Sequence, residues 1–167
     1  KNWWGNSYRG AVTPRTGIRD SMNVVAVKVM VETGIDLCYD YLLNFGFTTL
    51  ENDNHAATAL GGLTKGVTQV ELAAAYGTLA NQGQYIRPMF YDKVLDHDGN
   101  VLLENTKETR QVVKPSTGYI VTQLMTSVVK EGTGTAANFK QSNMPLAGKT
   151  GTTTDSKDLT FVGYTPY

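Results

Sequence analysis

The stretch that decides the fold is Ala147-Gly148-Lys149-Thr150-Gly151-Thr152-Thr153, near the carboxyl end of the chain. We expect it to form one extended segment, in which successive side chains point to opposite faces. Lys149, Gly151 and Thr153 would then share one face, and Thr150 and Thr152 the other. Glycine in a strand lets a ligand come close to the backbone, and a lysine flanked by hydroxyl donors suits a carboxylate or another anion. The stretch therefore predicts an anion-binding strand.

The segments around this strand predict a mixed α+β fold. Leu159–Tyr164 is expected to form a second strand, joined to the first as an antiparallel hairpin. Predicted helices are Pro14 to about Asp20, Val24–Glu32, Ile35–Phe45, residues 69–82 and Ser116–Lys130, with a helical turn at Ala136–Phe139. Further predicted strands are Ile86–Leu95 and Val101–Leu103, around a turn at Asp96–Gly99, and Gln111–Val113. Residues 48–66 are expected to be a loop.

Several helix ends are marked by local chemistry. Thr13 and Pro14 are typical of an N-cap followed by proline at the first helical position. Thr68 and Glu71, three residues apart, form a capping-box pattern. Gly34 and Gly46 are good residues for the carboxyl ends of the two helices that precede them.

Composition narrows the possible functions. Hydrophobic residues make up 41% and charged residues 18% of the 167 residues, as in an ordinary globular domain. The 15 basic residues balance the 15 acidic ones, which gives no electrostatic reason to propose nucleic acid or an anionic membrane as partner. One cysteine, Cys38, excludes an internal disulfide framework and a multi-cysteine zinc site; it is expected in the core. We predict no metal and no cofactor.

A second element is the triplet Ser21-Met22-Asn23, which is the only Ser-x-Asn in the chain. Alone it is a weak signal, because serine and asparagine are common at helix starts, where they cap the first turn. With its context, and with Lys149-Thr150-Gly151 downstream, the triplet gains a functional meaning.

The order of these and other segments resembles the transpeptidase domain of class A penicillin-binding proteins, which are bifunctional peptidoglycan synthases. The resemblance covers nearly all of the chain. It implies the fold of penicillin-binding proteins and serine β-lactamases, an antiparallel sheet with helices, of which this chain would hold an incomplete part. The matching segments are Ser21–Val27, Ala59–Thr68, Glu71–Gly83, Lys130–Gly134, Lys149–Thr153, Asp158 and Phe161–Pro166. One departure is Thr160, where the family often has tryptophan.

The resemblance implies a serine D,D-transpeptidase, which attacks the D-Ala-D-Ala end of a peptidoglycan stem peptide and is acylated by β-lactam antibiotics. Ser21 then matches the serine that relays a proton toward the leaving amine, and Lys149 its lysine partner. Asn23 matches the asparagine that binds the peptide. Thr150, Gly151 and Thr152 match the carboxylate-binding segment, where the backbone N–H of Thr152 would be an oxyanion-hole donor.

The family pattern also needs a Ser-x-x-Lys element that holds the nucleophile and its base. No such element lies among the 20 residues that precede Ser21. The one formal match, Ser127-Val128-Val129-Lys130, falls between the other two motifs and at the end of a predicted helix, so we interpret it as structural. Glu131, beside it, is expected at the surface.

The simplest interpretation is that residues 1–167 are the C-terminal part of one transpeptidase domain. The Ser-x-x-Lys segment would lie upstream, and the last strand and helix downstream. The chain alone would then be inactive, and its partner would be the rest of the domain, on the same chain or on a separate one. The resemblance also implies a location at the extracytoplasmic face of a bacterial membrane, anchored through a segment that these residues lack.

Three alternatives stand beside this interpretation. Gly148-Lys149-Thr150 resembles the end of a nucleotide-binding loop, but the first glycine of that motif falls on Asn143, and the loop must open a helix. A non-catalytic module on the same scaffold, or a D,D-carboxypeptidase or β-lactamase with the same motifs, stays open.

His55 and His97 are expected at the surface, and Trp3 and Trp4 in packing. Gly61 and Gly62 are interpreted as structural residues of a loop near the site.

Overall fold

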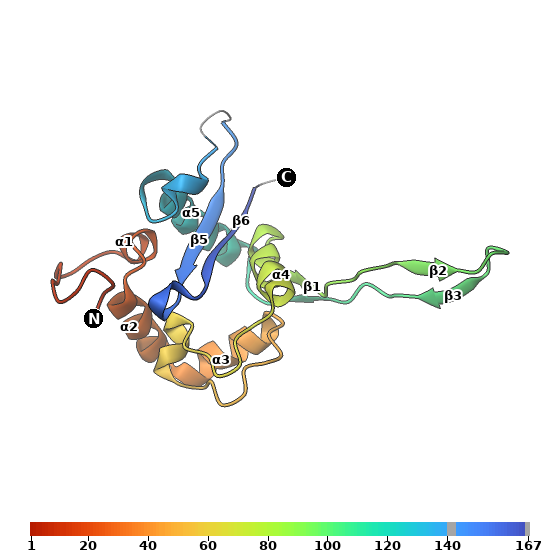
Figure 1. The fold of residues 1–167 in the computed structure, drawn as a ribbon, viewed down its shortest axis with the longest axis horizontal. Helices are drawn as coiled ribbons and strands as arrows, with labels where there is room; N and C mark the ends of the chain where they lie inside the picture. Colours follow the sequence, from red (N-terminus) through yellow and green to blue (C-terminus); the bar gives the residue numbers. More distant parts are fainter. Residues whose placement is uncertain (140–142, 166–167) are drawn as a thin grey trace.

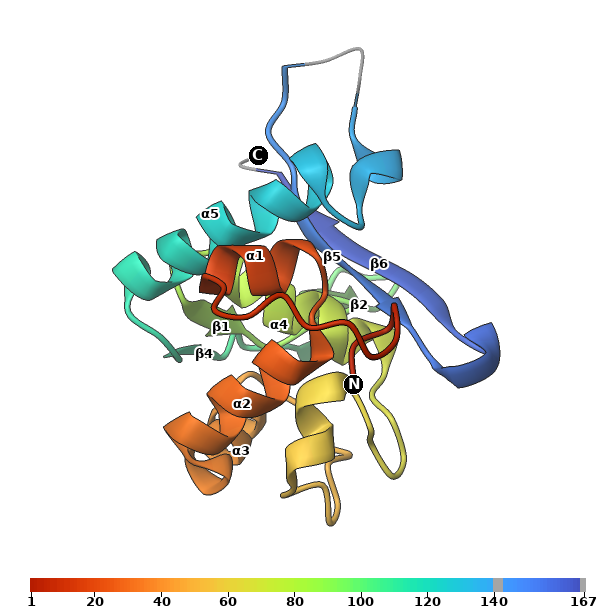
Figure 2. The same ribbon diagram turned by 90° about the vertical axis from the view of Figure 1, so that its left-hand side faces the viewer.

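The computed structural model describes residues 1–139 and 143–165. Pro166, the last residue of the resemblance, and Tyr167 lie outside them. Figure 1 shows a body of helices around the hairpin of β5 (Ala147–Thr152) and β6 (Leu159–Tyr164), from which a second, long hairpin projects to one side. Figure 2 shows α1 (Pro14–Arg19) lying across α5 (Pro115–Glu131), with the amino-terminal segment in front. The predicted α+β class is confirmed.

The first two helices follow the predicted local signals. The Thr13 hydroxyl accepts a hydrogen bond from the N–H of Thr16, and Pro14 occupies the first turn of α1. Helix α2 (Asn23–Thr33) ends at Gly34, whose φ of 106° is one that glycine adopts readily. Asp20, Ser21 and Met22 separate the two helices, so the triplet begins in the expected break and ends on the first residue of α2.

Helix α3 (Ile35–Asn44) follows directly, and residues 48–66 form the predicted loop with one addition. The loop contains a short 3-10 helix, η1 (Ala56–Leu60), which packs against α2. Asp53 holds the loop together, because its fully buried carboxylate accepts hydrogen bonds from the N–H and hydroxyl of Thr64 at 2.8 Å. The prediction that Cys38 lies in the core was wrong, since it is only half-buried on α3.

Helix α4 (Gln69–Ala80) begins with the complete capping box of Thr68 and Glu71 and ends two residues earlier than predicted. The Glu71 carboxylate also accepts hydrogen bonds from the N–H and hydroxyl of Thr48, at 2.9 and 2.6 Å. This one side chain therefore ties the start of α4 to the loop that precedes η1.

We expect the Glu71→Gln substitution to destabilise the fold by about 1 kcal/mol at neutral pH, because a charged acceptor of four hydrogen bonds is lost. Burial raises the pKa of Glu71, but the hydrogen bonds from Thr48 and Thr68 outweigh it and lower the pKa from 4.5 to about 2. A carboxyl whose pKa is lower in the folded state stabilises the fold above the unfolded-state pKa. That stabilisation disappears as the pH falls from about 4.5 toward 2.

Thermal unfolding of the full-length protein, followed by circular dichroism between pH 7 and pH 2, measures this effect. The variant should lose stability at pH 7 and show a smaller further loss in acid than the wild type. Glu108→Gln is the matched control, since Glu108 forms only an exposed surface ion pair with Arg87. Equal acid sensitivity of Glu71→Gln and the wild type would contradict the assignment.

The strands upstream of α5 differ from the prediction. The expected single strand Ile86–Leu95 is two strands, β1 (Gln84–Ile86) and β2 (Lys93–Leu95), which pair with different partners. Pro88 lies between them, and proline has no N–H to donate to a sheet. Strand β1 pairs with β4 (Thr109–Gln111), two residues before the predicted strand at 111–113, and β2 pairs with β3 (Val101–Glu104). The β2–β3 pair is the projecting hairpin of Figure 1.

The helix α5 and the hairpin β5–β6 form the centre of the body. Strands β5 and β6 are antiparallel, with Ala147 opposite Tyr164 and Thr152 opposite Leu159, as the hairpin prediction required. Helix α5 packs against β5, α1 packs against α5, and α4 contacts both α5 and β6. The predicted helical turn after α5 is observed as η2 (Thr135–Ala137). The buried apolar side chains are Met22, Met30, Leu50, Ala75, Tyr85, Met125, Val128, Val129, Leu146 and Ala147.

No helix in the described part of the chain combines the length and apolar character needed to cross a membrane.

Candidate active site

A cavity of about 540 Å³ lies between the α1–α2 break, η1, α4 and the hairpin β5–β6. One wall is apolar and is formed mainly by α1, α2 and α4, with Ile18, Val25 and Leu72 among its residues. The opposite wall is polar and follows β5. The six predicted site residues all line this cavity: Ser21, Asn23, Lys149, Thr150, Gly151 and Thr152.

Lys149 is the centre of the polar wall. Its Nζ donates a hydrogen bond to Ser21 Oγ at 2.8 Å, across 128 positions of sequence, and another to the carbonyl of Thr150 at 2.9 Å. Burial lowers the pKa of Lys149 below that of an ordinary lysine. Within residues 1–139 and 143–165, Lys149 has no carboxylate ion-pair partner. The result is a partly desolvated cation that contacts a hydroxyl and has charge available for an anion.

The hydroxyl of Ser21 reaches Lys149 because of an unusual backbone conformation. The N–H of Met22 bonds to the carbonyl of Gly17 at 2.8 Å, and that of Ser21 to Ile18 at 3.2 Å, the two bonds of a Schellman helix end. Ser21 occupies the left-handed position of this motif, with a φ of 52°, where glycine is the usual residue. For a residue with a side chain this costs roughly 1–2 kcal/mol. The strained residue is therefore the one whose hydroxyl lies at the cavity.

The alternative that Ser21 caps the start of the next helix was wrong. Met22 is the N-cap residue of α2, and no side chain of its own segment bonds there. The cap comes from a distant residue, because the Oδ1 of buried Asn2 accepts a hydrogen bond from the N–H of Val24 at 3.2 Å. Asn23, the first residue of α2, is left to line the cavity.

Two glycines of β5 lie in close contact with the neighbouring strand β6, and one of them, Gly151, lines the cavity. A Cβ on Gly151 would lie 2.5 Å from Thr160 Oγ1, and one on Gly148 would lie 2.5 Å from the Phe161 ring and 2.9 Å from the carbonyl of Val162. The Thr150 hydroxyl lies 2.8 Å from the hydroxyl of Thr133 in the turn after α5. Lys149, Thr150, Gly151 and Thr152 all reach the cavity, so both predicted faces of the strand contribute to it.

Thr153 does not share the lysine's strand face, since β5 ends at Thr152. Its hydroxyl instead accepts a hydrogen bond from the N–H of Asp158 at 2.8 Å, inside the turn of the hairpin. Of the loop glycines, Gly61 also lines the cavity, which places the loop beside the site.

Sequence reasoning missed three residues near the predicted site. Tyr76 lines the cavity, and burial raises the pKa of its hydroxyl. Its spacing of four residues from Leu72, on one face of a helix, was the signal that could have found it. Thr160 lines the cavity beside Gly151, and Thr133 bonds to Thr150. Neither contact has a signal in the local sequence.

Ser127, Glu131 and the two histidines lie as expected, whereas Trp3, which was expected in packing, is 66% exposed. Ser127 is 4% exposed, and its hydroxyl donates to the carbonyl of Leu124 in its own helix. Glu131 is an exposed residue at the end of α5, and His55 and His97 are exposed. Gly148-Lys149-Thr150 lies within a strand and opens no helix, so it is not a nucleotide-binding loop. In the described parts of the chain, no group of three or more His, Cys, Asp or Glu side chains could hold a metal ion.

Comparisons with known proteins agree on one family. The family model described as penicillin binding protein transpeptidase domain matches residues 1–167. Penicillin-binding protein 1A of Clostridium novyi (strain NT) is 40% identical over 99% of this chain and 20% of its own length. Penicillin-binding protein 1F of Bacillus subtilis (strain 168) is 36% identical over 98% of this chain and 23% of its own. The chain thus spans about a fifth of the length of the curated relatives that it matches.

Solved structures agree on the fold. Penicillin-binding protein 1A of Haemophilus influenzae superposes with a TM-score of 0.83 at 23% identity, covering 98% of this chain and 30% of that one. Penicillin-binding protein A of M. tuberculosis, in its imipenem acyl-enzyme complex, gives 0.82 at 22% identity, covering 99% and 42%. The expected resemblance to class A penicillin-binding proteins is confirmed. The chain belongs to the penicillin-binding protein transpeptidase domain family.

Proposed function

We propose that this chain forms one side of the acyl-transfer cleft of a serine D,D-transpeptidase. The full-length protein would cross-link peptidoglycan stem peptides through an acyl-enzyme and would be acylated by β-lactams. The observation that carries the proposal is the 2.8 Å contact between Lys149 Nζ and Ser21 Oγ, beside a strand of hydroxyls and glycine. It is supported by membership of the transpeptidase domain family.

Each residue has a role in this proposal that follows from its chemistry. Lys149 polarises the Ser21 hydroxyl, which passes a proton to the nitrogen that leaves when the amide bond breaks. Thr150 and Thr152 donate hydroxyl hydrogen bonds to the terminal carboxylate of a D-alanyl peptide or of a penicillin, and Lys149 supplies positive charge nearby. The absence of a side chain at Gly151 lets the substrate approach the strand, and the N–H of Thr152 stabilises the oxyanion. Asn23 binds the peptide amide.

The nucleophile would come from outside these 167 residues, because Ser127-x-x-Lys130 is the only Ser-x-x-Lys they contain and Ser127 is buried. The same domain would be completed by a segment carrying this element, placed against the apolar wall of the cavity. The chain is then the C-terminal part of one transpeptidase domain and is inactive by itself. It would act at the extracytoplasmic face of a bacterial membrane, where peptidoglycan lies, anchored through another segment.

Labelling with a fluorescent penicillin tests this proposal. We expect the full-length protein to form one stable covalent adduct that survives denaturing electrophoresis, whereas residues 1–167 alone form none. Failure of the full-length protein to acylate would reject the enzyme and favour a non-catalytic module on this scaffold. Labelling of the isolated chain would show that the nucleophile lies within it.

A product assay separates the related enzymes that share the fold. With a D-Ala-D-Ala stem peptide and an added amine acceptor, a transpeptidase releases D-Ala and forms the new amide. A carboxypeptidase releases D-Ala and leaves the free acid even at high acceptor concentration. A β-lactamase releases hydrolysed antibiotic in many turnovers instead of keeping the adduct.

A further inference from the structure

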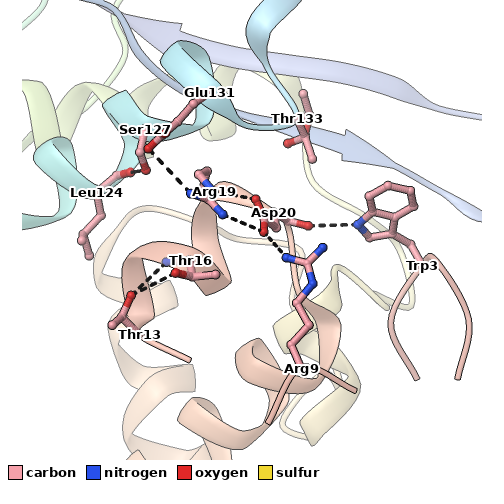
Figure 3. A network of polar contacts seen from close by, with 11 residues as sticks. Trp3, Arg9, Thr13, Thr16, Arg19, Asp20, Leu124, Ser127, Glu131 and Thr133 are labelled. Carbon is pink, nitrogen blue, oxygen red and sulfur yellow. Dashed lines mark hydrogen bonds and ion pairs between the residues drawn. The ribbon is translucent and has the colours of Figure 1, made fainter. Parts of the chain in front are cut away.

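The amino-terminal strap, residues Asn2–Arg9, wraps around the break that carries Ser21 and contacts it from two sides. Asn2 caps α2 through the N–H of Val24. Trp3 donates its indole N–H to the backbone carbonyl of Asp20 at 2.9 Å, although the residue is 66% exposed and does not line the cavity. Figure 3 shows Trp3 and Arg9 approaching Asp20 from the strap. The strap therefore holds the residues immediately before and after the Ser21–Asn23 triplet.

Asp20 is the point at which these contacts converge. Its carboxylate accepts two hydrogen bonds from the Arg19 guanidinium, at 2.7 and 3.1 Å, and an ion pair from Arg9. Figure 3 shows both guanidinium groups directed at this one carboxylate. Arg9 in turn lies 4.5 Å from the centre of the Trp4 ring, which fixes its approach. The Asp20 side chain is 15% exposed, so water screens these contacts less than at an open surface.

The same segment is also bonded to the turn after α5. The carbonyl of Arg19 accepts a hydrogen bond from the N–H of Thr133 at 3.2 Å, and the Thr133 hydroxyl bonds to that of Thr150. Two successive carbonyls, those of Arg19 and Asp20, are thus bonded to different parts of the chain. The next residue along the chain is Ser21, with its left-handed backbone.

A strained conformation persists only where the surrounding structure enforces it. The Schellman bonds hold the backbone of Ser21 against α1, but glycine would satisfy them equally well. They do not fix the position of the chain that follows Ser21. The position of the Ser21 hydroxyl relative to β5 needs restraints from outside α1. The strap and the Asp20 contacts are the restraints that the described structure offers on this side of the break.

We infer that Asp20, held by Arg9, Arg19 and Trp3, is a positioning residue that keeps Ser21 Oγ within hydrogen-bond distance of Lys149 Nζ. The amino-terminal strap is then a functional part of the site. The predicted effect on acylation rests on the proposed function. The predicted effect on the contact between Ser21 and Lys149 rests on geometry alone. It predicts that damage to this network affects the acyl-transfer step more than the binding of the antibiotic, because the carboxylate-binding strand stays in place.

The test uses Asp20→Ala in the full-length protein and resolves acylation by a β-lactam into the dissociation constant of the first complex and the acylation rate constant. We expect the rate constant to fall roughly 10- to 100-fold, as for a small misplacement of a reacting group, with the dissociation constant changed less than threefold. Trp3→Phe removes the indole donor, keeps an aromatic ring beside Trp4, and should produce a smaller fall of the same kind. Asp20→Asn keeps the side-chain size and serves if the alanine variant does not fold.

Glu131→Gln is the matched control. Glu131 lies 3.8 Å from the Arg19 guanidinium and is exposed, but it does not contact Asp20, so its loss should leave both constants unchanged. Equal falls in binding and acylation, together with a lower thermal midpoint, would indicate general structural damage and overturn the inference. An unchanged acylation rate constant would overturn it as well.

A crystal structure of the full-length Asp20→Ala variant gives a second readout that does not depend on activity. We expect Ser21 to move and its hydroxyl to lose the contact with Lys149 Nζ. An unchanged 2.8 Å contact would reject the positioning role. If the wild-type protein is not acylated at all, the proposed function fails, and this structural comparison still decides the role of Asp20.

Discussion

The Lys149→Ala substitution is expected to lower the acylation rate of the full-length protein by a β-lactam roughly 10²- to 10⁴-fold, the range for losing a positioned proton-transfer group. Lys149 is the only described donor within hydrogen-bond distance of Ser21 Oγ, and without it the hydroxyl loses both its polarisation and its orientation. The substitution also removes positive charge from the carboxylate-binding strand, so the initial binding should weaken too. Stopped-flow fluorescence with a reporter β-lactam measures both constants.

Two further variants make this result specific. Lys157→Ala removes an exposed lysine from the turn of the same hairpin and should leave acylation unchanged. Lys149→Arg keeps the charge and should change the pH profile. Burial lowers the pKa of Lys149 from 10.5, so its ammonium loses its proton at a pH below 10.5. The wild-type rate should therefore fall in alkaline solution, and this fall should begin below pH 10.5. Arginine stays charged, so any activity of that variant should lack this fall. Equal rates for Lys149→Ala and the wild type would refute the assigned role.

The Gly132→Ala substitution is expected to destabilise the protein by about 1–3 kcal/mol, the usual cost of forcing an atom into a packed site. A Cβ there would lie 2.4 Å from the carbonyl oxygen of Arg19 and 2.9 Å from the Cα of Val128, and both are backbone atoms that cannot rotate away. Relief requires α1 and the end of α5 to separate. That movement would carry Ser21 away from β5, so acylation should slow as well.

Chemical denaturation of the full-length protein measures the loss of stability, and the labelling assay measures the functional effect. Gly77→Ala is the control: Gly77 lies in α4, nothing lies within 4 Å of a Cβ built on it, and alanine favours a helix. This variant should be as stable as the wild type or more so. A Gly132→Ala protein of unchanged stability would mean that α1 and α5 do not pack as closely as the structure places them.

Features that depend on neighbours in sequence were predicted well. The caps at Thr13 and Thr68, and the hairpin turn between β5 and β6, depend on bonds between residues a few positions apart, so local sequence suffices. The long run Ile86–Leu95 failed for the opposite reason, since each half pairs with a different distant strand. The local sequence around Asn2 does not reveal its capping role, because the helix whose N-terminus it caps begins 21 positions later.

The candidate site divides in the same way. The triplet Ser21–Asn23 and the stretch Lys149–Gly151 could be identified from the sequence, because their order and context resemble one family. Thr133 and Thr160 could not, since contacts across the fold bring them to the site. Whether the six predicted residues act as proposed stays a prediction until the variants are measured.

By itself, the sequence determined the α+β class, most helix boundaries, the β5–β6 hairpin and the two motifs that point to acyl transfer. Only the tertiary structure decided that Ser21 lies in a left-handed helix end, that its hydroxyl meets Lys149, and that the strap and the turn after α5 bond to the two residues before it. The physical reason is the distance along the sequence between the residues that interact. Caps and turns are satisfied by bonds within a few residues, whereas the position of a strained hydroxyl is set by many weak contacts from distant segments.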